Sequence, residues 1–359
     1  MNLKTLKLER SILSSKKFQR LQQISLVVDH MRVRDTAQTR ASHSIEVANS
    51  IEIMNYVISK QVGFNIDRYN CGRIVGLLHD IGHTAFSHEG EIVLNKLIKT
   101  KSKKRLSFEG NANNYITIQK NCLLDHVEKD IKHYILASLA KHIEELYEEQ
   151  GSLKKIIKKE LKKEVEFLNK NGLNVSTLNK TIQCQIMDIA DENSYIISDI
   201  IDSLNIFSKN ELADILRKEL SFKVSDKLIR SLYKGQNHFR RTMQTFHDKF
   251  CENFQLNEVG EIIPIDKELE EIRLNMAKIS KKYILTNKIV LISRNEIRKK
   301  LHKVFEYYLD FKNAHKIPSK YYRTEFFKAS SKIEKLKIIR NMLGSLTNKG
   351  LLKEYKKIL

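Results

Sequence analysis

Apolar residues recur at helical spacing along most of the chain, and this pattern predicts an all-α protein. Seven apolar side chains in residues 43–60 fall near one helical face. Residues 152–169 carry an apolar stripe beside a face of Lys and Glu. Further helices are predicted over 72–79, 181–206, 267–285 and 296–311. Strand-like runs are few, and only residues 258–265 have the pattern of a short hairpin.

The composition supports a helical, globular chain. Of its 359 residues, 41% are hydrophobic and 30% charged, which is typical of a folded protein. Only 2 Pro and 12 Gly are present, fewer than the turns of a β-sandwich or an α/β fold usually need. No internal repeat or low-complexity linker divides the chain. One mostly helical domain is therefore the simplest organisation.

The sequence also suggests where the protein resides. No apolar run approaches the roughly 20 residues that span a bilayer. The first residues, MNLKTLKLERS, contain no apolar signal segment. The four cysteines are far apart and form no C-x-x-C pair, so reduced thiols are expected. We therefore expect a cytoplasmic protein with no membrane partner.

The net charge of the chain indicates which class of partner it attracts. The net charge is +21, and residues 271–359 contain 23 Lys or Arg against 7 Asp or Glu. Such a field attracts polyanions, among them nucleic acids and nucleotide phosphates. A background rich in Lys, Ile and Asn would explain the excess equally well. Charge alone selects a kind of partner and indicates no reaction.

One segment concentrates chemically active side chains. Residues 76–91, GLLHDIGHTAFSHEGE, contain three His, one Asp and two Glu. Because His79 and Asp80 directly follow an apolar run, burying them is costly unless they are paired or bound to a metal. With His43 upstream and Asp191 downstream they form a mixed N/O set that Mn²⁺, Fe²⁺, Mg²⁺ or Zn²⁺ accepts. A His-Asp pair alone would be explained better as a satisfied core histidine.

These residues lie in a series of motifs with a known order. The motifs are SSKKFQRLQQ (14–23), TRASHSIEVA (39–48), HDIGHTAFSHEGE (79–91), FEGNANNYIT (108–117), IADENSYIISDIID (189–202), HKIPSKYY (315–322) and RNMLGSLTNKG (340–350). They resemble the HD-domain metal-dependent phosphohydrolases, whose signature is H…HD…D. One branch is especially similar: the deoxyguanosine-triphosphate triphosphohydrolases and related dNTPases, which include the vertebrate SAM-and-HD-domain dNTPase. The resemblance extends nearly from end to end.

The resemblance implies a metal-dependent reaction. The ligands would be His43, His79, Asp80 and Asp191, holding one divalent ion. Mn²⁺ and Mg²⁺ are the first candidates, and Fe²⁺, Co²⁺ and Zn²⁺ are alternatives. Water would attack the α-phosphorus of a dNTP, with dGTP as a candidate preferred substrate, and release deoxynucleoside and triphosphate. An HD core over 1–210 and a helical, basic part over 211–359 packed on it are expected.

The resemblance also implies roles for residues around the ion. His88 is the candidate for proton handling or phosphate contact, with Glu91 orienting it or the water. His83 would bind phosphate or support the ligands, and Arg40 would contact the triphosphate.

Further residues are assigned to the sugar. Tyr195 would pack on it and Asp199 would accept a hydrogen bond from the 3′-hydroxyl, while Asn111 is a possible neighbour of the site. Because Asp191, Tyr195 and Asp199 are spaced by four residues, they share one helical stripe. Two departures from the family pattern affect these contacts: Leu26 replaces a Gln associated with the sugar, and Gly110 replaces a His of some relatives.

Other hypotheses about the function remain open at this point. The chain could be another HD-superfamily phosphohydrolase, such as a nucleotidase or an alarmone hydrolase. It could instead be a nucleic-acid-binding regulatory protein with a residual metal site. A nucleotide or single-stranded DNA effector fits the basic charge. The resemblance further implies a homo-oligomer, such as a hexamer or another dihedral assembly.

Overall fold

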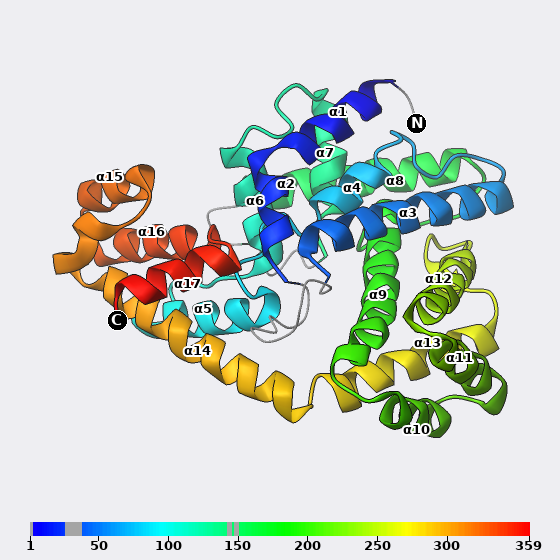
Figure 1. Cartoon of the computed structure of the whole chain (residues 1–359). Helices are drawn as coiled ribbons and strands as arrows, with labels where there is room; N and C mark the ends of the chain where they lie inside the picture. Colours follow the sequence, from blue (N-terminus) through cyan, green and yellow to red (C-terminus); the bar gives the residue numbers. More distant parts are fainter. Residues whose placement is uncertain (1–2, 26–37, 142–145, 147–150) are drawn as a thin grey trace.

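The computed structural model describes residues 3–25, 38–141, 146 and 151–359, so Leu26 lies outside the described residues. Within this part the prediction of an all-α fold is confirmed (Figure 1). The helices are α1 (Leu3–Ser14), α2 (Lys16–Arg20), α3 (Arg40–Val62), α4 (Gly72–Leu78), α5 (Ser87–Lys101), α6 (Gly110–Lys120), α7 (Lys129–Ser138), α8 (Gly151–Lys170), α9 (Ile182–Asp202), α10 (Lys209–Glu219), α11 (Phe222–Lys234), α12 (Gln236–Glu252), α13 (Lys267–Ile279), α14 (Lys288–Leu309), α15 (Lys320–Lys328), α16 (Lys332–Gly344) and α17 (Asn348–Lys357).

The only sheet in the described part is a two-stranded hairpin, β1 (Phe254–Leu256) with β2 (Ile262–Pro264). The prediction of a hairpin over 258–265 found the second strand and misplaced the first. The residues between the strands form the turn, where Gly260 adopts a left-handed φ of 82° and the Asn257 side chain accepts from the backbone of Glu261. Alternation of apolar and polar residues cannot separate such a turn from a strand.

Helix α3 is the central element of the first of three hydrophobic cores. Thr39 caps its start in a capping box with Ser42, and Gly63 ends it at a left-handed φ of 78°. It packs most extensively on α4 and α9. The crossing with α4 is close because Gly76 faces Ala48; a Cβ at Gly76 would lie 2.6 Å from the Ala48 Cα. This crossing brings the end of α4 beside the first turns of α3.

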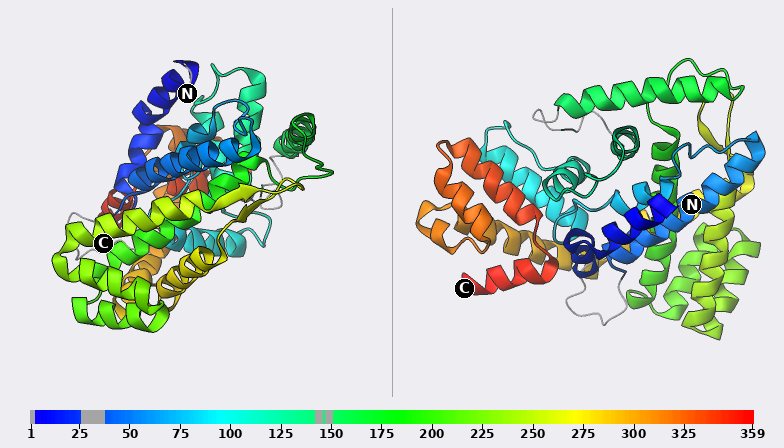
Figure 2. Two further views of the ribbon diagram at one scale, coloured as in Figure 1. Left: turned by 90° about the vertical axis from the view of Figure 1, so that its right-hand side faces the viewer. Right: turned by 90° about the horizontal axis from the view of Figure 1, so that it is seen from above.

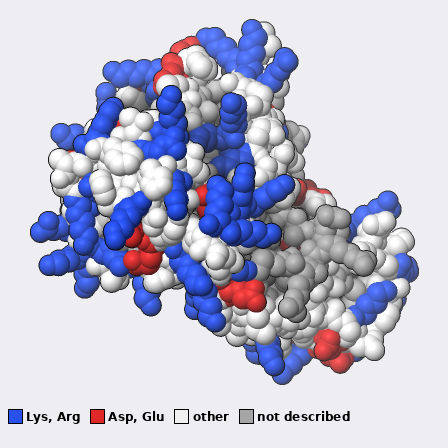
Figure 3. Space-filling view, turned by 60° about the vertical axis from the view of Figure 1, so that its left-hand side comes forward, with Lys and Arg blue, Asp and Glu red and all other residues white. Residues whose placement is uncertain are grey.

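Two further cores flank this centre. Helix α5 packs with α14 to α17 around Leu94, Phe305 and Leu343, among others. The second half of α9 packs with α10 to α13 around residues such as Ile200, Phe239 and Met276. Figures 1 and 2 place α15–α17 and α10–α12 at opposite ends of the molecule, with α9 between the first core and α10–α13. Lys and Arg are widespread on the face shown in Figure 3, where acidic groups are few. No helix in the described ranges is long and apolar enough to cross a membrane.

A buried ion pair joins α12 to α3. His247 is 1% exposed, and its Nδ1 lies 3.0 Å from Glu46 Oε1. Its Nε2 lies 3.2 Å from the Ser50 hydroxyl oxygen. Burial alone would lower the pKa of His247, but the hydrogen bonds with Cys251 and Glu46 outweigh it and raise the pKa to about 10. The imidazole is therefore charged at neutral pH.

This pair predicts a pH-dependent contribution to stability. A histidine whose pKa is higher in the folded than in the unfolded state stabilises the fold fully below the unfolded value of about 6.5. The contribution is lost as pH rises toward 10. We expect His247→Gln to lower the free energy of unfolding by about 2 kcal/mol at pH 6 and by much less at pH 10. Urea denaturation of both proteins across this range measures the difference; a difference independent of pH contradicts the assignment.

Candidate metal centre and active-site cavity

The candidate metal-binding side chains come from three elements that the fold brings together. The first turn of α3 supplies His43, the turn after α4 supplies His79 and Asp80, and α9 supplies Asp191. The turn after α4 is fixed by Asn114 of α6, whose side-chain amide donates to the carbonyl of His79 and accepts at 2.6 Å from the Gly82 N–H. The close approach of α6 to this turn requires glycine, because a Cβ at Gly82 would lie 2.3 Å from the backbone nitrogen of Asn114.

His43, His79 and Asp191 form a compact group of ligand atoms, all within 4.8 Å of one another. The His43 Nε2 lies 2.8 Å and the His79 Nε2 lies 3.5 Å from Asp191 Oδ1. Both histidines are fully buried, and the Asp191 side chain is 16% exposed. Two imidazoles and a carboxylate at this spacing can hold a divalent ion.

The hydrogen bonding of His79 provides a test of whether an ion fits. Its Nδ1 lies 2.6 Å from the Gly76 carbonyl oxygen, which can only accept, so Nδ1 carries a proton. The buried Nε2 has no hydrogen-bond partner in the described structure, and it faces Asp80 Oδ1 at 3.4 Å and Asp191 Oδ1 at 3.5 Å. Burial alone would lower the pKa of His79, but Asp80 and Asp191 raise it, so a positive charge is favoured between these three groups. A bound cation can supply that charge in place of the ring proton, so the donor set fits a metal.

Asp80, the fourth predicted ligand, lies beside this group of three but is not part of it, because Arg40 engages its carboxylate. Its Oδ2 lies 3.8 Å from the His43 Nε2 and is hydrogen-bonded and ion-paired with Arg40. Burial alone would raise the pKa of Asp80, but Arg40 and the neighbouring histidines hold it well below its ordinary value. Arg40 is itself 1% exposed and also donates to the Tyr195 hydroxyl at 2.9 Å and the Ser87 hydroxyl at 2.9 Å. In this arrangement Arg40 orients Asp80 and Tyr195.

Lys141 completes the charge balance around Asp191. Its Nζ lies 2.5 Å from Asp191 Oδ2, on the carboxylate oxygen that does not face the histidines, and 3.5 Å from Asp188 Oδ1. Burial alone would lower the pKa of Lys141, but Asp191 and Asp188 raise it above its ordinary value. A permanent positive charge therefore lies beside the metal-binding group.

A cavity of about 500 Å³ opens beside this group. Asp191, Tyr195 and Asp199 line one wall as the stripe of α9 that their spacing predicted, and Arg294 and Arg298 of α14 are also part of the lining. Both arginines lie near the buried Glu89, and Arg298 forms a hydrogen-bonded ion pair with it. This volume is in the range of small-molecule sites.

The same wall contains a buried carboxylate oxygen without a hydrogen-bond partner among the described residues. Asp199 is 4% exposed, and Ser280 donates to its Oδ2. Its Oδ1 is buried and has no hydrogen-bond partner among the described residues. Burial raises the pKa of Asp199 to about 7. A ligand hydroxyl would satisfy this oxygen.

A second group of titratable residues lies next to the first. His83, His88 and Glu91 offer ligand or proton-transfer atoms within 4.8 Å of one another. His83 is buried, with Nδ1 3.3 Å from Asp80 Oδ1, whereas the His88 side chain is 61% exposed and lines the cavity. The protein around the ring and the charge of Arg40 lower the pKa of His88 although its side chain is largely exposed, so the ring is neutral at pH 7. The Gly110 N–H donates to Glu91 at 3.1 Å, and a Cβ at Gly110 would lie 2.9 Å from the same carboxylate.

Comparison with known proteins gives this geometry a context. No family model matches the chain. The deoxyguanosinetriphosphate triphosphohydrolase-like protein of Clostridium tetani is 29% identical over 320 residues, which cover 86% of this chain and 74% of that protein. The triphosphohydrolase-like proteins 2 of Mesorhizobium japonicum and Vibrio cholerae are 31% and 30% identical over 225 and 201 residues. The aligned parts are 44% and 43% of those two proteins, less than half of their length.

The chain is a homologue of the deoxyguanosinetriphosphate triphosphohydrolase-like proteins. The resemblance inferred from the motifs is thereby confirmed.

The structure places most of the predicted site residues in one region and leaves one apart. Asn111 donates its amide to Glu109, the cap of α6, at 2.9 Å and is not among the described residues that line the cavity. Lys141, Arg294 and Arg298 were not predicted. The sequence contained a signal for Lys141, because this residue directly follows the apolar run YILASLA just as His79 follows VGLL. The sequence contained no signal for Arg294 and Arg298, because they lie in the Lys- and Arg-rich part of the chain.

The geometry predicts how metal binding responds to substitution. We expect His79→Ala and Asp191→Asn each to weaken Mn²⁺ binding by at least about 100-fold, because each removes a ligand atom from the buried group. Isothermal titration with Mn²⁺ measures this, and circular dichroism checks the fold. His238→Ala, at an exposed histidine of α12, is the matched control. Unchanged Mn²⁺ affinity in both ligand variants contradicts the site.

Proposed function

We propose that the protein is a metal-dependent dNTP triphosphohydrolase, which cleaves a dNTP to a deoxynucleoside and inorganic triphosphate. The observation that carries the proposal is the buried His43–His79–Asp191 group at the edge of a cavity that also offers cations and a free acceptor. The names of the homologues support the same substrate class. A preference for dGTP belongs to the proposal as the candidate specificity.

The proposed ligands are His43, His79, Asp80 and Asp191. A divalent ion held by them would neutralise phosphate charge and lower the pKa of a water molecule, which is what such ions supply to phosphoryl transfer. In the absence of an ion His43 lies 2.8 Å from Asp191 through Nε2, so binding displaces a proton or reorients this contact. The Nδ1–H of His79 remains on the Gly76 carbonyl and keeps the ring in the ligand orientation.

The basic side chains bind the triphosphate in this proposal. Lys141, Arg294 and Arg298 surround the metal-binding group and the cavity from two sides. Their carboxylate partners keep them in place before substrate arrives, so little reorganisation is needed when phosphate oxygens bind. Arg40 holds Asp80 and Tyr195, and it would contact the triphosphate after exchanging one of these partners.

His88 and Glu91 handle the proton in this proposal. The oxygen of water forms a bond to the α-phosphorus and releases a proton to solvent, the bond from that phosphorus to O5′ breaks, and O5′ takes a proton from protonated His88. His88 is neutral before substrate binds, and the negative charge of a bound triphosphate favours its protonation at the cavity mouth. The Glu91 carboxylate, 4.0 Å from the His88 Nδ1, orients the ring, and His83 supports Asp80 from the other side.

The α9 stripe would select a deoxyribose. Tyr195 is fixed by Arg40 and packs against the rings of His43 and His88 at 5.3 and 6.0 Å, so its position in the wall is set. A rigid ring at this place leaves little room for a 2′-hydroxyl. Asp199 Oδ1 is the proposed acceptor for the 3′-hydroxyl.

The reaction products test the proposal directly. We expect the purified protein with Mn²⁺ or Mg²⁺ to release one triphosphate and one deoxynucleoside for each dNTP consumed. Ion-exchange chromatography of the four dNTP reactions identifies the products and the preferred base. EDTA and the Asp191→Asn variant should abolish turnover, whereas His238→Ala should not change it. Release of single phosphate indicates a nucleotidase and contradicts the proposal.

The role of Asp199 gives a second prediction. Because the pKa of Asp199 is about 7, its carboxylate is charged at pH 8.5. A hydrogen bond to a charged group is worth roughly 1.5–3 kcal/mol, so at that pH kcat/KM for a dNTP should exceed that for its 2′,3′-dideoxy analogue by about 10- to 100-fold. In Asp199→Ala this preference should disappear. Glu192→Gln, on the same helix and in the lining of the same cavity, is the control and should keep it. An undiminished preference in Asp199→Ala rules out the proposed contact.

A further inference from the structure

A cavity beside the N-terminal helix α1 has an apolar floor. It has a volume of about 410 Å³ and lies between α1, the start of α4 and residues 126–131 at the start of α7. Two of its apolar lining residues belong to the buried first core, and four are partly buried residues that pack against this core. They are Cys71 and Ile74 in the core, and Leu8, Tyr69, Val127 and Ile131 around it. The fold therefore leaves part of its first core uncovered inside this cavity.

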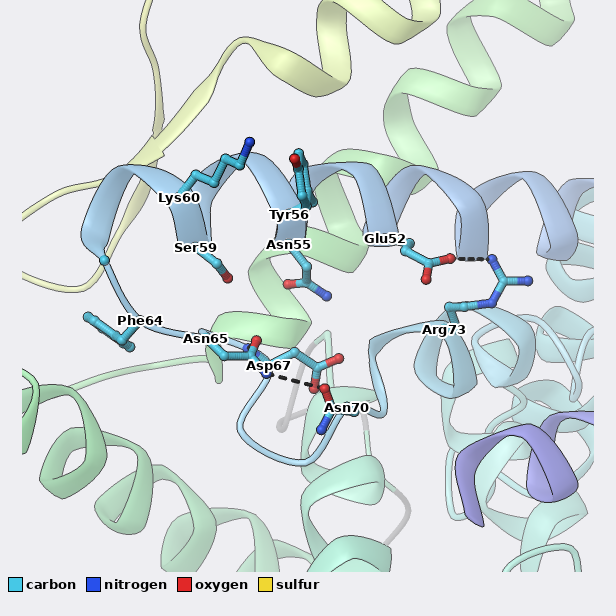
Figure 4. A pocket seen from close by; sticks show the side chains of 11 residues that line it. Glu52, Asn55, Tyr56, Ser59, Lys60, Phe64, Asn65, Asp67, Asn70 and Arg73 are labelled. Carbon is cyan, nitrogen blue, oxygen red and sulfur yellow. Dashed lines mark hydrogen bonds and ion pairs between the residues drawn. The ribbon is translucent and has the colours of Figure 1, made fainter. Parts of the chain in front are cut away.

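The loop between α3 and α4 separates this cavity from a polar pocket. Tyr69 and Cys71 line the cavity, whereas Asp67 and Arg73 line the pocket. Asp67 accepts hydrogen bonds from two backbone N–H groups at the start of α4, and Figure 4 shows Arg73 paired with Glu52. These charged groups are compensated within the protein, and polar side chains make up most of the lining of the pocket. A hydrocarbon chain would therefore find an apolar surface in the cavity and not in the pocket.

The mouth of the cavity has an excess of positive charge. Lys4 and Lys7 of α1 line it from one side, and Glu128, the residue before α7, lines it from the other. Lys4 pairs with Glu128 at 2.7 Å, and these two side chains are 84% and 64% exposed. Lys7 is exposed as well and has no ion-pair partner among the described residues. One positive charge at the mouth thus remains uncompensated beside an apolar interior.

The apolar floor and the charged mouth together define a class of ligand. An aliphatic chain gains free energy when it leaves water for an apolar surface, roughly in proportion to the area that is buried. A carboxylate at the end of such a chain gains from a charge-assisted hydrogen bond with an ammonium group. The volume of the cavity is in the range of small-molecule sites. An anion with a single aliphatic chain satisfies both features.

We propose that this cavity binds a free aliphatic carboxylate, with the chain on the apolar floor and the carboxylate beside Lys7. Because Lys4 is held by Glu128, Lys7 is the partner of the carboxylate. An acid in solution can enter the cavity whole, whereas a membrane lipid would have to withdraw its chain from a bilayer. The site is separate from the active-site cavity, shares no lining residue with it, and does not depend on the proposed reaction.

Isothermal titration of the full-length protein tests the proposal, with EDTA present and all amphiphiles below their micelle concentration. The probes are decanoate, the shorter octanoate, and decyltrimethylammonium, which has the same chain and the opposite charge. We expect one decanoate to bind per chain. Octanoate should bind about tenfold more weakly, because it buries two methylene groups fewer. The cationic probe should also bind at least about tenfold more weakly than decanoate, because Lys7 repels it.

Two variants localise the binding. Ser11→Phe fills the cavity from an exposed position of α1, and its matched control is Ser152→Phe, at an exposed serine of α8 outside the lining. Decanoate binding should be lost or weakened at least about tenfold in Ser11→Phe and unchanged in the control. Lys7→Gln should weaken the binding of decanoate and not that of decyltrimethylammonium. Circular dichroism checks the fold of each variant; if Ser11→Phe does not fold, the ratio of the two affinities in Lys7→Gln decides.

Three results would overturn the proposal: equal decanoate binding by Ser11→Phe and its control, equal affinity for the anionic and the cationic probe, or no binding of decanoate. Sedimentation with phosphatidylglycerol vesicles that is lost in Ser11→Phe, without binding of free decanoate, would assign the cavity to a membrane lipid and would also overturn it. All these measurements are made without dNTP and without a divalent ion. Failure of the proposed hydrolase activity therefore leaves their outcome unchanged.

Discussion

The organisation of this protein depends on carboxylates and imidazoles that are buried side by side. The Nε2 atom of His79 faces oxygens of both Asp80 and Asp191, in a place from which water is largely excluded. Such a group destabilises a fold unless cations compensate it. Arg40 and Lys141 supply part of the compensation, each on a carboxylate oxygen other than the one shared with His79. The space between the ligand atoms is the natural place for the remaining positive charge.

The rest of the fold holds this group together. The close crossing at Gly76 and Ala48 brings α4 against α3, and Asn114 and Arg20 bind the turn that follows α4 through its backbone. The side chains of that turn are thereby free for the metal on one side, while its carbonyls are held from the other. Two cavities are consequences of this arrangement: the active-site cavity opens on the side chains, and a cavity between α2, α6, α15 and α16 lies behind the carbonyls. The C-terminal helices line part of each cavity, so the basic part of the chain contributes to both.

The sequence predicted what local periodicity and motif spacing encode. The helical class and the α9 stripe follow from apolar spacing, whereas the set of candidate ligands on three distant segments rests on the resemblance of their motifs to a known family. What it missed depends on tertiary contact. Lys141 becomes a site residue only because α9 passes beside the end of α7, and Arg294 and Arg298 only because α14 crosses α5 at Glu89. Asn111 was predicted to be a neighbour of the site from its place in the motif, and its amide donates to Glu109, the cap of α6. The first hairpin strand was misplaced because a turn with a left-handed glycine has the same polar alternation as a strand.

The central claim is that a single divalent ion binds between His43, His79, Asp80 and Asp191. Anomalous diffraction from crystals grown with Mn²⁺ locates such an ion without reference to activity. The account predicts one strong peak per chain within coordination distance of the two histidine Nε2 atoms and of both aspartates. A peak confined to His83, His88 and Glu91, or the absence of any peak between the four ligands, would contradict it.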